Sequence, residues 1–541
     1  MISKRLVACV SLAAVLAACE SGDINLQPTN IDNSTSNGGG GGGAANTCAS
    51  YRVGGATRQG NFDGTNCTYN ANFVAETNPL TVDLLIPFFS GVHIFQNSLF
   101  IGQDVSSGTA PAGGSGPKLV IEAGNTIAFT DSGDYLLINR GSQIIANGSA
   151  AAPITFTGFT DAVSKSAGPF DVQLWGGIVI NGNGITNNCT DAQRLGNTCH
   201  VEAEGRPSFY GGSNNADNSG ELRYILVKHA GFEVAPGDEL NGVTFNAVGS
   251  GTTVENLEVY SAYDDGLEFF GGAVNISNYV ALYVRDDSID FSDGYIGTID
   301  NALIIQSPTD GNRCIEGDNV ASTRVAGGAS QTPLSRPTIR HMTCITSNFD
   351  VGTHGDSEGP IIRYGARLLL SDSIIDGGRA TTKFGLNSNE CLEIDRDLNN
   401  DTSSAAAAGE TTLNRTVISC QEAYVSGTAD NLVNGDTGQQ WVRGAGTTGT
   451  YGFNTFNVII TDPANANVEV LQPGTFFSVD RDAAAQTVTI VGAADANVVI
   501  GSVAAPVPGG YIGAVRSAAN WTATWTYGIY AAKRGIAPWW E

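Results

Sequence analysis

The sequence predicts an all-β fold built as a solenoid, in which short strands stack coil upon coil. Residues 256–272 (NLEVYSAYDDGLEFFGG) and 278–294 (NYVALYVRDDSIDFSDG) superpose with a spacing of 22 residues. Residues 301–317 continue the repeat after 23 more residues and place Asp310 near the position of Asp287. A unit of this length, with two short apolar runs joined by a turn, cannot bury its apolar face alone and must stack on its neighbours.

Strand-like segments extend this pattern over residues 116–423. Short runs rich in β-branched and aromatic residues end in Gly or Asn, which suit the left-handed backbone of a corner. Such runs lie at 119–129, 135–148, 174–183, 222–231, 338–345 and 361–376. The coils are expected to be interrupted by one long inserted loop, at residues 187–218.

The two ends of the chain differ from the coils in composition. Residues 19–47 are polar and contain six consecutive glycines, which predicts a flexible tether. Residues 48–115 are predicted to cap the first coil, because an open strand edge invites aggregation. Residues 424–541 hold five of the six tryptophans and are predicted to be a closing β cap. Their aromatic side chains could form a lid or could stack on sugars.

Residues 1–18 have the features of a secretion signal. Two basic residues precede an apolar run that is too short for a stable membrane span. The run ends in LAAC at residues 16–19, which resembles the lipobox of bacterial lipoproteins. The resemblance implies cleavage before Cys19, lipid attachment to its sulfur and an anchor in the bilayer of the outer membrane, with the extracellular face favoured over the periplasmic one. An ordinary secretory signal cleaved after Ala18 is the alternative.

The charge balance excludes one class of partner. The chain has 53 acidic and 27 basic residues and a formal net charge of -26. A protein that neutralises nucleic-acid phosphates carries the opposite charge, so nucleic acid is not an expected partner. Cations, basic surfaces and neutral glycans remain compatible.

Eight of the ten cysteines remain once Cys9 and Cys19 are assigned to the signal and to the lipid. An even number in an exported chain favours disulfides, and neighbours in sequence are the simplest pairing. Zinc is the weaker alternative, because there is no C-x-x-C and the five histidines are scattered. The expected pairs are Cys48 with Cys67, Cys189 with Cys199, Cys314 with Cys344, and Cys391 with Cys420.

The acidic residues of the repeat are the first candidate site. Equivalent positions of stacked coils lie about 4.8 Å apart, so their carboxylates form ladders. Like charges this close repel, which calls for a cation, basic partners or protons. Calcium, which takes several flexible oxygen ligands, is the expected ion. The ladder ligands would be Asp265, Glu268, Asp287 and Asp290.

A second calcium candidate follows at residues 395–401. Asp395, Asp397, Asn399 and Asp401 alternate along the chain and could wrap one hard cation. Asn400 stands where an EF-hand requires glycine, so a looser loop or a solvated acidic segment is expected.

Three interpretations of the paired aspartates Asp264, Asp265, Asp286 and Asp287 stay open. They could bind a cation, or act as acid and base in glycoside hydrolysis, or form a plain hydrogen-bonded ladder at a corner. Lyase chemistry would need calcium and a basic residue, for which Arg285 and Arg313 are available. A G-x-S-x-G pattern at 355–359 reads as a turn, because a solenoid corner does not supply a nucleophile elbow.

Several segments together resemble a known family. WGGIVING, DDGLEFFGG, DDSIDFSDG, RCIEGDN and the terminal IGAV with NWTATWT are similar to right-handed parallel β-helices of the pectate-lyase-like superfamily. More narrowly, they resemble β-helix outer-membrane lipoproteins of Gram-negative bacteria. This resemblance implies a right-handed parallel β-helix and a surface location, and no settled activity. We therefore expect a surface lipoprotein that binds cations and a glycan or another outer-membrane component. The alternative is a polysaccharide lyase or glycoside hydrolase.

The lipid anchor can be tested by replacing its attachment residue. We predict that Cys19→Ser releases the protein from the outer-membrane fraction, because the thioether-linked lipid is the only anchor that the sequence predicts. Cell fractionation and immunoblotting measure the distribution. A variant that stays in the membrane fraction as tightly as the wild type contradicts the anchor.

Overall fold

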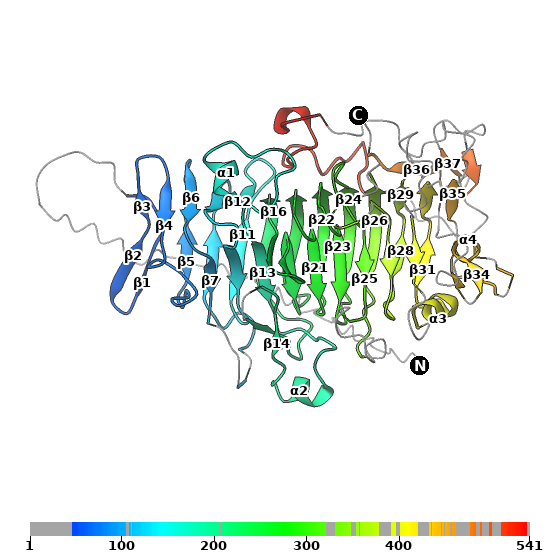
Figure 1. The fold of residues 1–541 in the computed structure, drawn as a ribbon, viewed down its shortest axis with the longest axis horizontal. Coiled ribbons are helices and arrows are strands. Elements are labelled where there is room, and N and C mark those ends of the chain that lie inside the picture. Colours follow the sequence, from blue (N-terminus) through cyan, green and yellow to red (C-terminus); the bar gives the residue numbers. More distant parts are fainter. Residues whose placement is uncertain are drawn as a thin grey trace, which may run out of the picture. The chain divides into compact units, whose positions relative to one another are not determined.

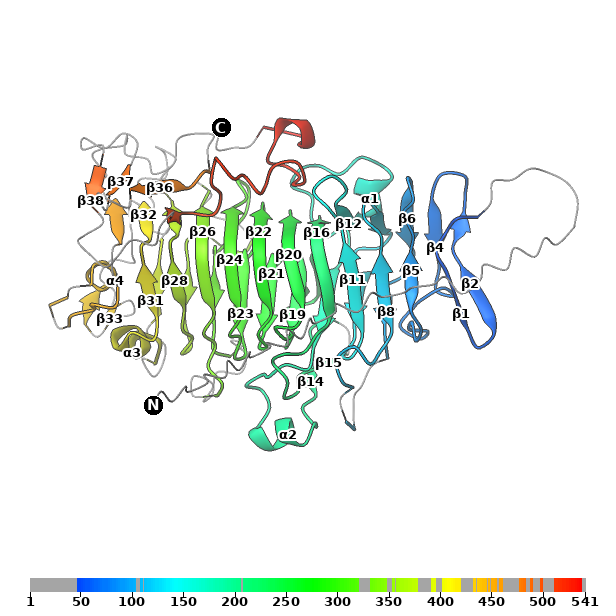
Figure 2. The same ribbon diagram turned by 180° about the vertical axis from the view of Figure 1, so that it is seen from behind.

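The computed structural model describes residues 46–103, 108–109, 111–205, 208–320, 331–347, 353–355, 357–377, 391–395 and 401–419, and parts of 432–537. Most of its strands lie in parallel sheets (Figures 1 and 2). The predicted all-β parallel β-helix is confirmed. Among the described residues, no helix is both long enough and apolar enough to span a membrane.

One side of the β-helix is a nine-stranded sheet in which all neighbouring strands are parallel. Its strands, in order of stacking, are β7 (Leu99–Ile101), β10 (Tyr135–Ile138), β13 (Gly177–Asn181), β19 (Val243–Asn246), β21 (Leu267–Phe270), β23 (Ile289–Ser292), β25 (Glu316–Gly317), β27 (Ile361–Ile362) and β30 (Glu393–Ile394).

The remaining sides form one continuous sheet of 18 strands. Its central members are the long strands β16 (Gly220–Lys228), β20 (Thr253–Tyr260), β22 (Asn275–Leu282), β24 (Thr298–Ile305) and β26 (Thr338–Ile345). In the other coils two shorter strands take the place of one long strand. These are β3 (Asn61–Phe62), β4 (Cys67–Tyr69), β5 (Leu84–Ile86), β6 (Val92–Phe95), β8 (Lys118–Ile121), β9 (Thr126–Phe129), β11 (Gln143–Asn147), β12 (Ile154–Gly158), β28 (Leu369–Ser371), β29 (Ile374–Asp376), β31 (Thr412–Asn414), β32 (Val417–Ser419) and β35 (Val458–Ile460).

Small hairpins and short helices complete the described chain. The hairpins pair β1 (Ser50–Val53) with β2 (Ala56–Gln59), β14 (Val201–Glu202) with β15 (Phe209–Tyr210), β17 (Phe232–Ala235) with β18 (Asp238–Leu240), and β33 (Leu432–Val433) with β34 (Asp436–Thr437). The strands β36 (Val479–Asp482), β37 (Thr487–Thr489), β38 (Asn497–Val499) and β39 (Tyr511–Ile512) form a further antiparallel sheet. The helices are α1 (Phe159–Ala162), α2 (Asp191–Leu195), α3 (Asp401–Ala408), α4 (Gly438–Val442) and the 3-10 turn η4 (Ala531–Lys533).

The register confirms the first repeat and corrects the second. Glu268 pairs with Asp290, 22 residues on, as the sequence predicts. In the following coil Asp290 pairs with Glu316, after 26 residues, although the long strands β22 and β24 keep the spacing of 23. Three extra residues therefore lie in the turn before β25. Arg313, rather than Asp310, occupies the position after Asp287.

Stacked aromatic rings fill the interior. Phe269 stacks on Phe245 with ring centroids 5.3 Å apart and on Tyr295 at 4.3 Å. Trp175 lies parallel to Phe129 at 5.0 Å and is fully buried. Each coil thus covers the apolar face of the next, which is the reason that the isolated unit cannot fold alone.

The long strands bend at one residue with a left-handed backbone. Asn256, Asn278 and Asn301 have φ of 58°, 62° and 61°. Their side chains form a ladder, because each amide donates to the Oδ1 of the preceding asparagine at 3.0 Å. Asparagine tolerates this backbone better than most residues, and the ladder satisfies its buried polar groups.

The first coils begin earlier than the boundary predicted at residue 116. Behind the β1–β2 hairpin, β4 already pairs in parallel with β6, and β5 with β8. The apolar segments that we assigned to a cap therefore form coils of their own, and β3 pairs antiparallel with β4 at the first edge of the sheet. Residues 187–218 form the predicted insertion, which carries α2 and the β14–β15 hairpin beyond the ends of the strands (Figure 1).

The C-terminal aromatic segment lies in a different place from the one expected. Residues 510–537 run along the outside of the 18-stranded sheet, beside β20 to β26, instead of closing the last coil (Figures 1 and 2). The reason is that these strands also carry apolar residues on their outward face, including Val280, Leu282 and Leu303, which need cover. Trp525 is fully buried there, so it forms part of a lid and not a sugar platform.

Three of the expected disulfides are present. They join Cys48 to Cys67, Cys189 to Cys199 and Cys314 to Cys344. Cys391 is also disulfide-bonded, and its predicted partner Cys420 lies outside the described residues.

The asparagine ladder predicts different effects for two substitutions of Asn278. Both Asn278→Gly and Asn278→Ala remove the amide, but only alanine must hold a strained backbone, at a cost of about 1–2 kcal/mol. We expect alanine to lower the free energy of unfolding by about 1 kcal/mol more than glycine does. Urea denaturation followed by circular dichroism measures the difference, and equal losses would contradict the strain.

Candidate functional site

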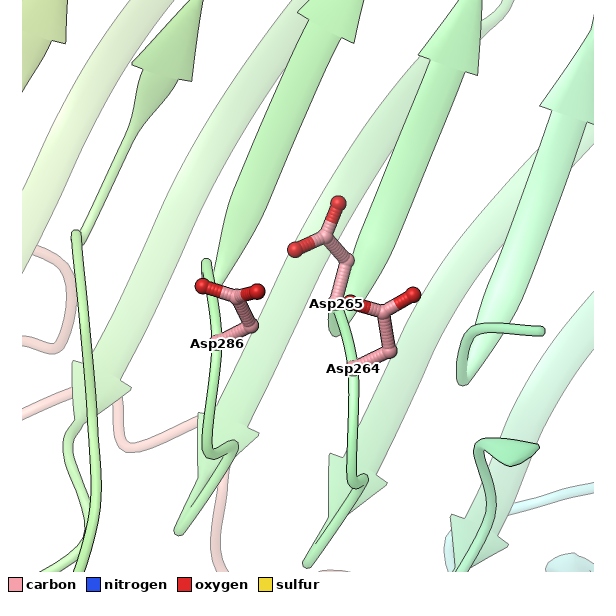
Figure 3. A group of neighbouring side chains, drawn as sticks. All are labelled: Asp264, Asp265 and Asp286. Carbon is pink, nitrogen blue, oxygen red and sulfur yellow. The ribbon is translucent and has the colours of Figure 1, made fainter. Parts of the chain in front are cut away.

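The paired aspartates lie in equivalent turns that precede β21 and β23. Figure 3 shows Asp264 and Asp286 on successive turns, with Asp265 extending in another direction from Asp264. Asp265 and Asp287 are buried, whereas Asp264 and Asp286 are half-buried. The two members of each pair therefore have different environments, although the sequence treats them alike.

The buried members form a hydrogen-bonded ladder along the corner. Asn241 accepts the backbone N–H of Asp265 at 3.1 Å, and Asp265 accepts that of Asp287 at 3.0 Å. Asp287 in turn accepts the N–H of Arg313 at 2.7 Å. The hydrogen bonds expected for a plain corner ladder, one of the three interpretations of the pairs, are therefore present at these two residues. In the preceding coil, the uncharged side-chain amide of Asn241 accepts the equivalent backbone N–H.

Burial and crowding oppose ionisation of this ladder. Burial, followed by the charges of Asp264 and Asp290, raises the pKa of Asp265 well above its usual value. Burial and the charge of Asp286 do the same to the pKa of Asp287, against the opposing effect of the Arg313 N–H. One backbone hydrogen bond per carboxylate does not compensate the loss of water.

A second column of carboxylates crosses adjacent strands of the nine-stranded sheet. Glu268 of β21, Asp290 of β23 and Glu316 of β25 are in register on adjacent strands. Burial and the charges of Glu204 and Asp290 raise the pKa of Glu268 well above its usual value. Burial raises the pKa of Asp290 to about 7, although the charge of Arg363 opposes this.

The oxygens of the two ladders converge. Three overlapping groups have ligand atoms that all lie within 4.8 Å of one another: Asp264, Asp265 and Asp286; Asp265, Glu268 and Asp290; and Asp287, Asp290 and Glu316. In addition, the Oδ1 atom of Asp290 is buried and has no hydrogen-bond partner in the described part of the chain. Several carboxylate oxygens at this separation match the ligands that calcium prefers.

The four predicted ladder ligands are thus brought together, and Glu316 joins them. The sequence could not reveal Glu316, because the three extra residues before β25 shift it out of the repeat. Glu316 also forms an ion pair with Arg363, which bonds to Asp318 at 2.9 Å as well. At the end of the column, Arg363 therefore balances the charges of Glu316 and Asp318.

Asp264 and Asp286, the half-buried members of the two pairs, have a histidine neighbour that the sequence did not reveal. Asp286 accepts a hydrogen bond from Asn312 at 3.0 Å, and Asn312 also donates to the backbone carbonyl of His354. His354 lies 3.5 Å from Asp310. Burial alone would lower the pKa of His354, but the Asp310 carboxylate beside it and the other acidic charges around it raise the pKa.

The residues proposed for lyase or serine chemistry are engaged elsewhere. Arg285 donates to the carbonyl of Phe170 at 2.9 Å, and Arg313 pairs with Glu358 and with Glu393. Ser357 of the G-x-S-x-G pattern is fully buried and hydrogen-bonds to Gln306 and to the N–H of Ser347. The interpretation of this pattern as a turn, without a nucleophile, fits these contacts.

The second calcium candidate is only partly covered by the structure. Asp395 follows β30, and Asp401 begins α3. Asp397 and Asn399 lie outside the described residues, so this loop stays a prediction.

Comparison with known protein families identifies the fold. Residues 112–449 match the family model of the pectate-lyase like beta helix domain. The chain belongs to this β-helix family. The match covers both carboxylate ladders and all strands from β8 to β32. No curated protein and no solved structure matched the chain significantly. Family membership is compatible with binding a polysaccharide and with acting on one.

The corner ladder predicts opposite effects for two substitutions of Asp287 in metal-free buffer. Asp287→Asn keeps an acceptor for the Arg313 N–H, as Asn241 does naturally, and removes a buried charge. It should raise the free energy of unfolding at pH 8. Asp287→Ala leaves that N–H without a partner and should lower it by about 1–3 kcal/mol.

The contribution of Asp287 to the stability of the fold should decrease as the pH rises. Because the pKa of Asp287 is raised in the folded state, its contribution to stability is complete below its ordinary pKa of 3.8 and is lost as the pH rises above that value. Thermal unfolding between pH 4 and 8 should therefore show a smaller loss for Asp287→Asn than for the wild type. Identical pH profiles would contradict the raised pKa.

Proposed function

We propose that this chain is a cell-surface lipoprotein whose β-helix binds calcium through Glu268 and Asp290 of the strand column together with Asp265 beside them. The bound ion would help to hold a glycan or another component of the cell surface. The observation that carries the proposal is the convergence of these carboxylates: oxygens of Asp265, Glu268 and Asp290 lie within 4.8 Å of one another, and the buried Oδ1 of Asp290 has no hydrogen-bond partner in the described residues.

Ion pairs with the basic side chains that the structure describes do not neutralise Asp265, Glu268 and Asp290, although Glu316 at the end of the column is paired with Arg363. Within the described ranges, no lysine or arginine forms an ion pair with Asp265, Glu268 or Asp290. Asn241 donates a hydrogen bond to Glu268, which satisfies only one of its oxygens. A divalent cation relieves the repulsion of all members at once.

Calcium suits this arrangement better than magnesium. Strand carboxylates can rotate but cannot change their spacing, and calcium accepts six to eight oxygens in a flexible geometry. Magnesium demands a near-ideal octahedron and loses water reluctantly. Calcium also keeps coordination positions for external oxygens, so hydroxyl or carboxylate groups of a glycan could complete the shell.

The surface location rests on the sequence. The signal and the LAAC segment at 16–19 support a lipid anchor in the outer membrane, and the tether at 19–47 would hold the β-helix away from it. An acidic protein in that position meets divalent cations and polysaccharides.

A polysaccharide-cleaving enzyme is the second candidate. It is favoured by Asp264 and Asp286 on successive turns, with His354 and its partner Asp310 close by. A reducing-end assay and an assay for unsaturated products, on acidic and neutral polysaccharides, test it. Activity that disappears on substitution of Asp264, Asp265, Asp286 and Asp287 would establish an enzyme in place of a binding protein.

Calcium binding predicts a shift in thermal stability that depends on Asp290. At a hundred times the dissociation constant, a ligand of the native state adds about 2.7 kcal/mol to the free energy of unfolding. We expect Tm to rise with Ca²⁺ and to fall with chelator, and most of this shift to vanish in Asp290→Asn. The shift should also be smaller at pH 5 than at pH 8, because protons compete for a carboxyl with a pKa of about 7.

Glu255→Gln is the matched control. Glu255 lies in the coil of Glu268, on the 18-stranded sheet, where it pairs with Arg223. This variant should keep the full calcium shift. A Tm that responds to neither calcium nor chelator, together with no heat of binding in calorimetry, would count against the site.

A further inference from the structure

The C-terminal segment 510–537 is attached to the flank of the β-helix at two separate places. Near its start, Ala514 donates its N–H to Thr343 of β26 at 2.8 Å, and the Tyr511 hydroxyl donates to Asn301 at 2.7 Å. About a dozen residues later, Tyr527 donates its N–H to Glu258 of β20 at 2.8 Å. We call this segment the strap.

The strap covers apolar side chains that point away from the interior. Tyr527 packs against Tyr260 in an edge-to-face contact at 4.9 Å, and Trp525 packs against Tyr224 at 5.7 Å. Beneath the strap lie Tyr260, Val280, Leu282, Leu303 and Ile305, each 2% exposed or less. Release of the strap would therefore open an apolar surface to water, which favours attachment.

One charged side chain is an exception beneath the strap. Glu258 is in register with Val280 and Leu303 and is fully buried. Its Oε2 atom accepts the Tyr527 N–H, and its Oε1 atom has no hydrogen-bond partner in the described residues. A buried carboxylate in this position is costly when charged, whereas a neutral carboxyl group can still accept the N–H.

The groups that face Glu258 do not neutralise it. Lys228, on the neighbouring strand β16, bonds to Asp161 of α1 at 2.8 Å and lies over the Tyr527 ring at 3.9 Å. Lys533 of the strap bonds to the carbonyl of Thr524. The hydroxyls of Tyr260, Tyr279 and Tyr527 are the other titratable groups around Glu258. Burial raises the pKa of Glu258 to about 8, although the Tyr527 N–H and the two lysines oppose this.

We propose that the strap is a pH-sensitive fastening, held against the β-helix while Glu258 is protonated and loosened as this carboxyl group loses its proton. The distal part, residues 520–537, detaches first, because its attachment includes Glu258, whereas the part near Ala514 is attached through neutral groups. Loosening exposes the apolar flank of β20 to β24.

The direction and size of the effect follow from linkage. With the strap detached, Glu258 meets water and its pKa returns towards its ordinary value of 4.5. Protonated Glu258 therefore contributes fully to the free energy of strap attachment below that value. The contribution is lost as the pH rises to about 8, which is the pKa of Glu258 in the attached state. Within this window the detached fraction should rise about tenfold per pH unit, and above it the fraction should stay constant.

Hydrogen exchange of the full-length mature protein tests the proposal, with exchange rates corrected for the intrinsic effect of pH. In the wild type, protection of peptides from 520–537 should fall between pH 5 and pH 8 and then level off. Glu258→Gln accepts the same N–H without titrating, so its protection should not change with pH. Glu255→Gln, on the same strand and half-exposed, is the matched control and should follow the wild type.

Two results would overturn the proposal. The first is a wild-type protection of 520–537 that does not depend on pH. The second is a pH-dependent loss that Glu258→Gln retains, which would assign the effect to other groups, including the carboxylate ladders. If Glu258→Gln proves poorly folded, Tyr527→Phe serves as a second variant, because it keeps the N–H and should leave the pH dependence in place. Loss of that dependence in a folded Tyr527→Phe protein would contradict the role of Glu258.

Discussion

Stacking at one strand spacing forces equivalent side chains of successive coils into contact, and this constraint governs the whole structure. Where the repeated side chain is apolar, contact is favourable and produces the interior columns such as Phe245, Phe269 and Tyr295. Where it is asparagine, the amides bond to one another. Where it is a carboxylate, the same contact is repulsive unless each oxygen finds a donor, a proton or a cation.

The protein meets this problem in two ways. In the corner ladder, Asp265 and Asp287 accept backbone N–H groups, so these acids have a structural role that an amide could share, as Asn241 shows. In the strand column, Glu268 and Asp290 have no comparable set of donors. This difference directs the functional interpretation away from the paired aspartates and towards the strand column. Glu258 is a single buried carboxylate for which a negative charge is equally costly, and we infer that a proton neutralises it.

The sequence predicted what depends on local repetition and missed what depends on insertions or on distant segments. The β-helix and the pairing of Glu268 with Asp290 follow from a repeat that any reader can align. Glu316 was hidden because extra residues in one turn break the spacing, and His354 because it reaches the site from a later coil. The strap was misplaced at the end of the helix, because the sequence does not tell which face of β22 and β24 will need an apolar cover.

The most direct test of the account is the position of a bound ion. A crystal of the mature protein soaked in calcium, with a lanthanide as an anomalous substitute, should show a peak between the carboxylates of Asp265, Glu268 and Asp290. Coordination by at least two of these residues is the predicted result. Well-ordered carboxylates at these residues, with no anomalous peak at about 10 mM calcium, well above the dissociation constants of about 0.1–1 mM typical of extracellular calcium modules, would contradict it.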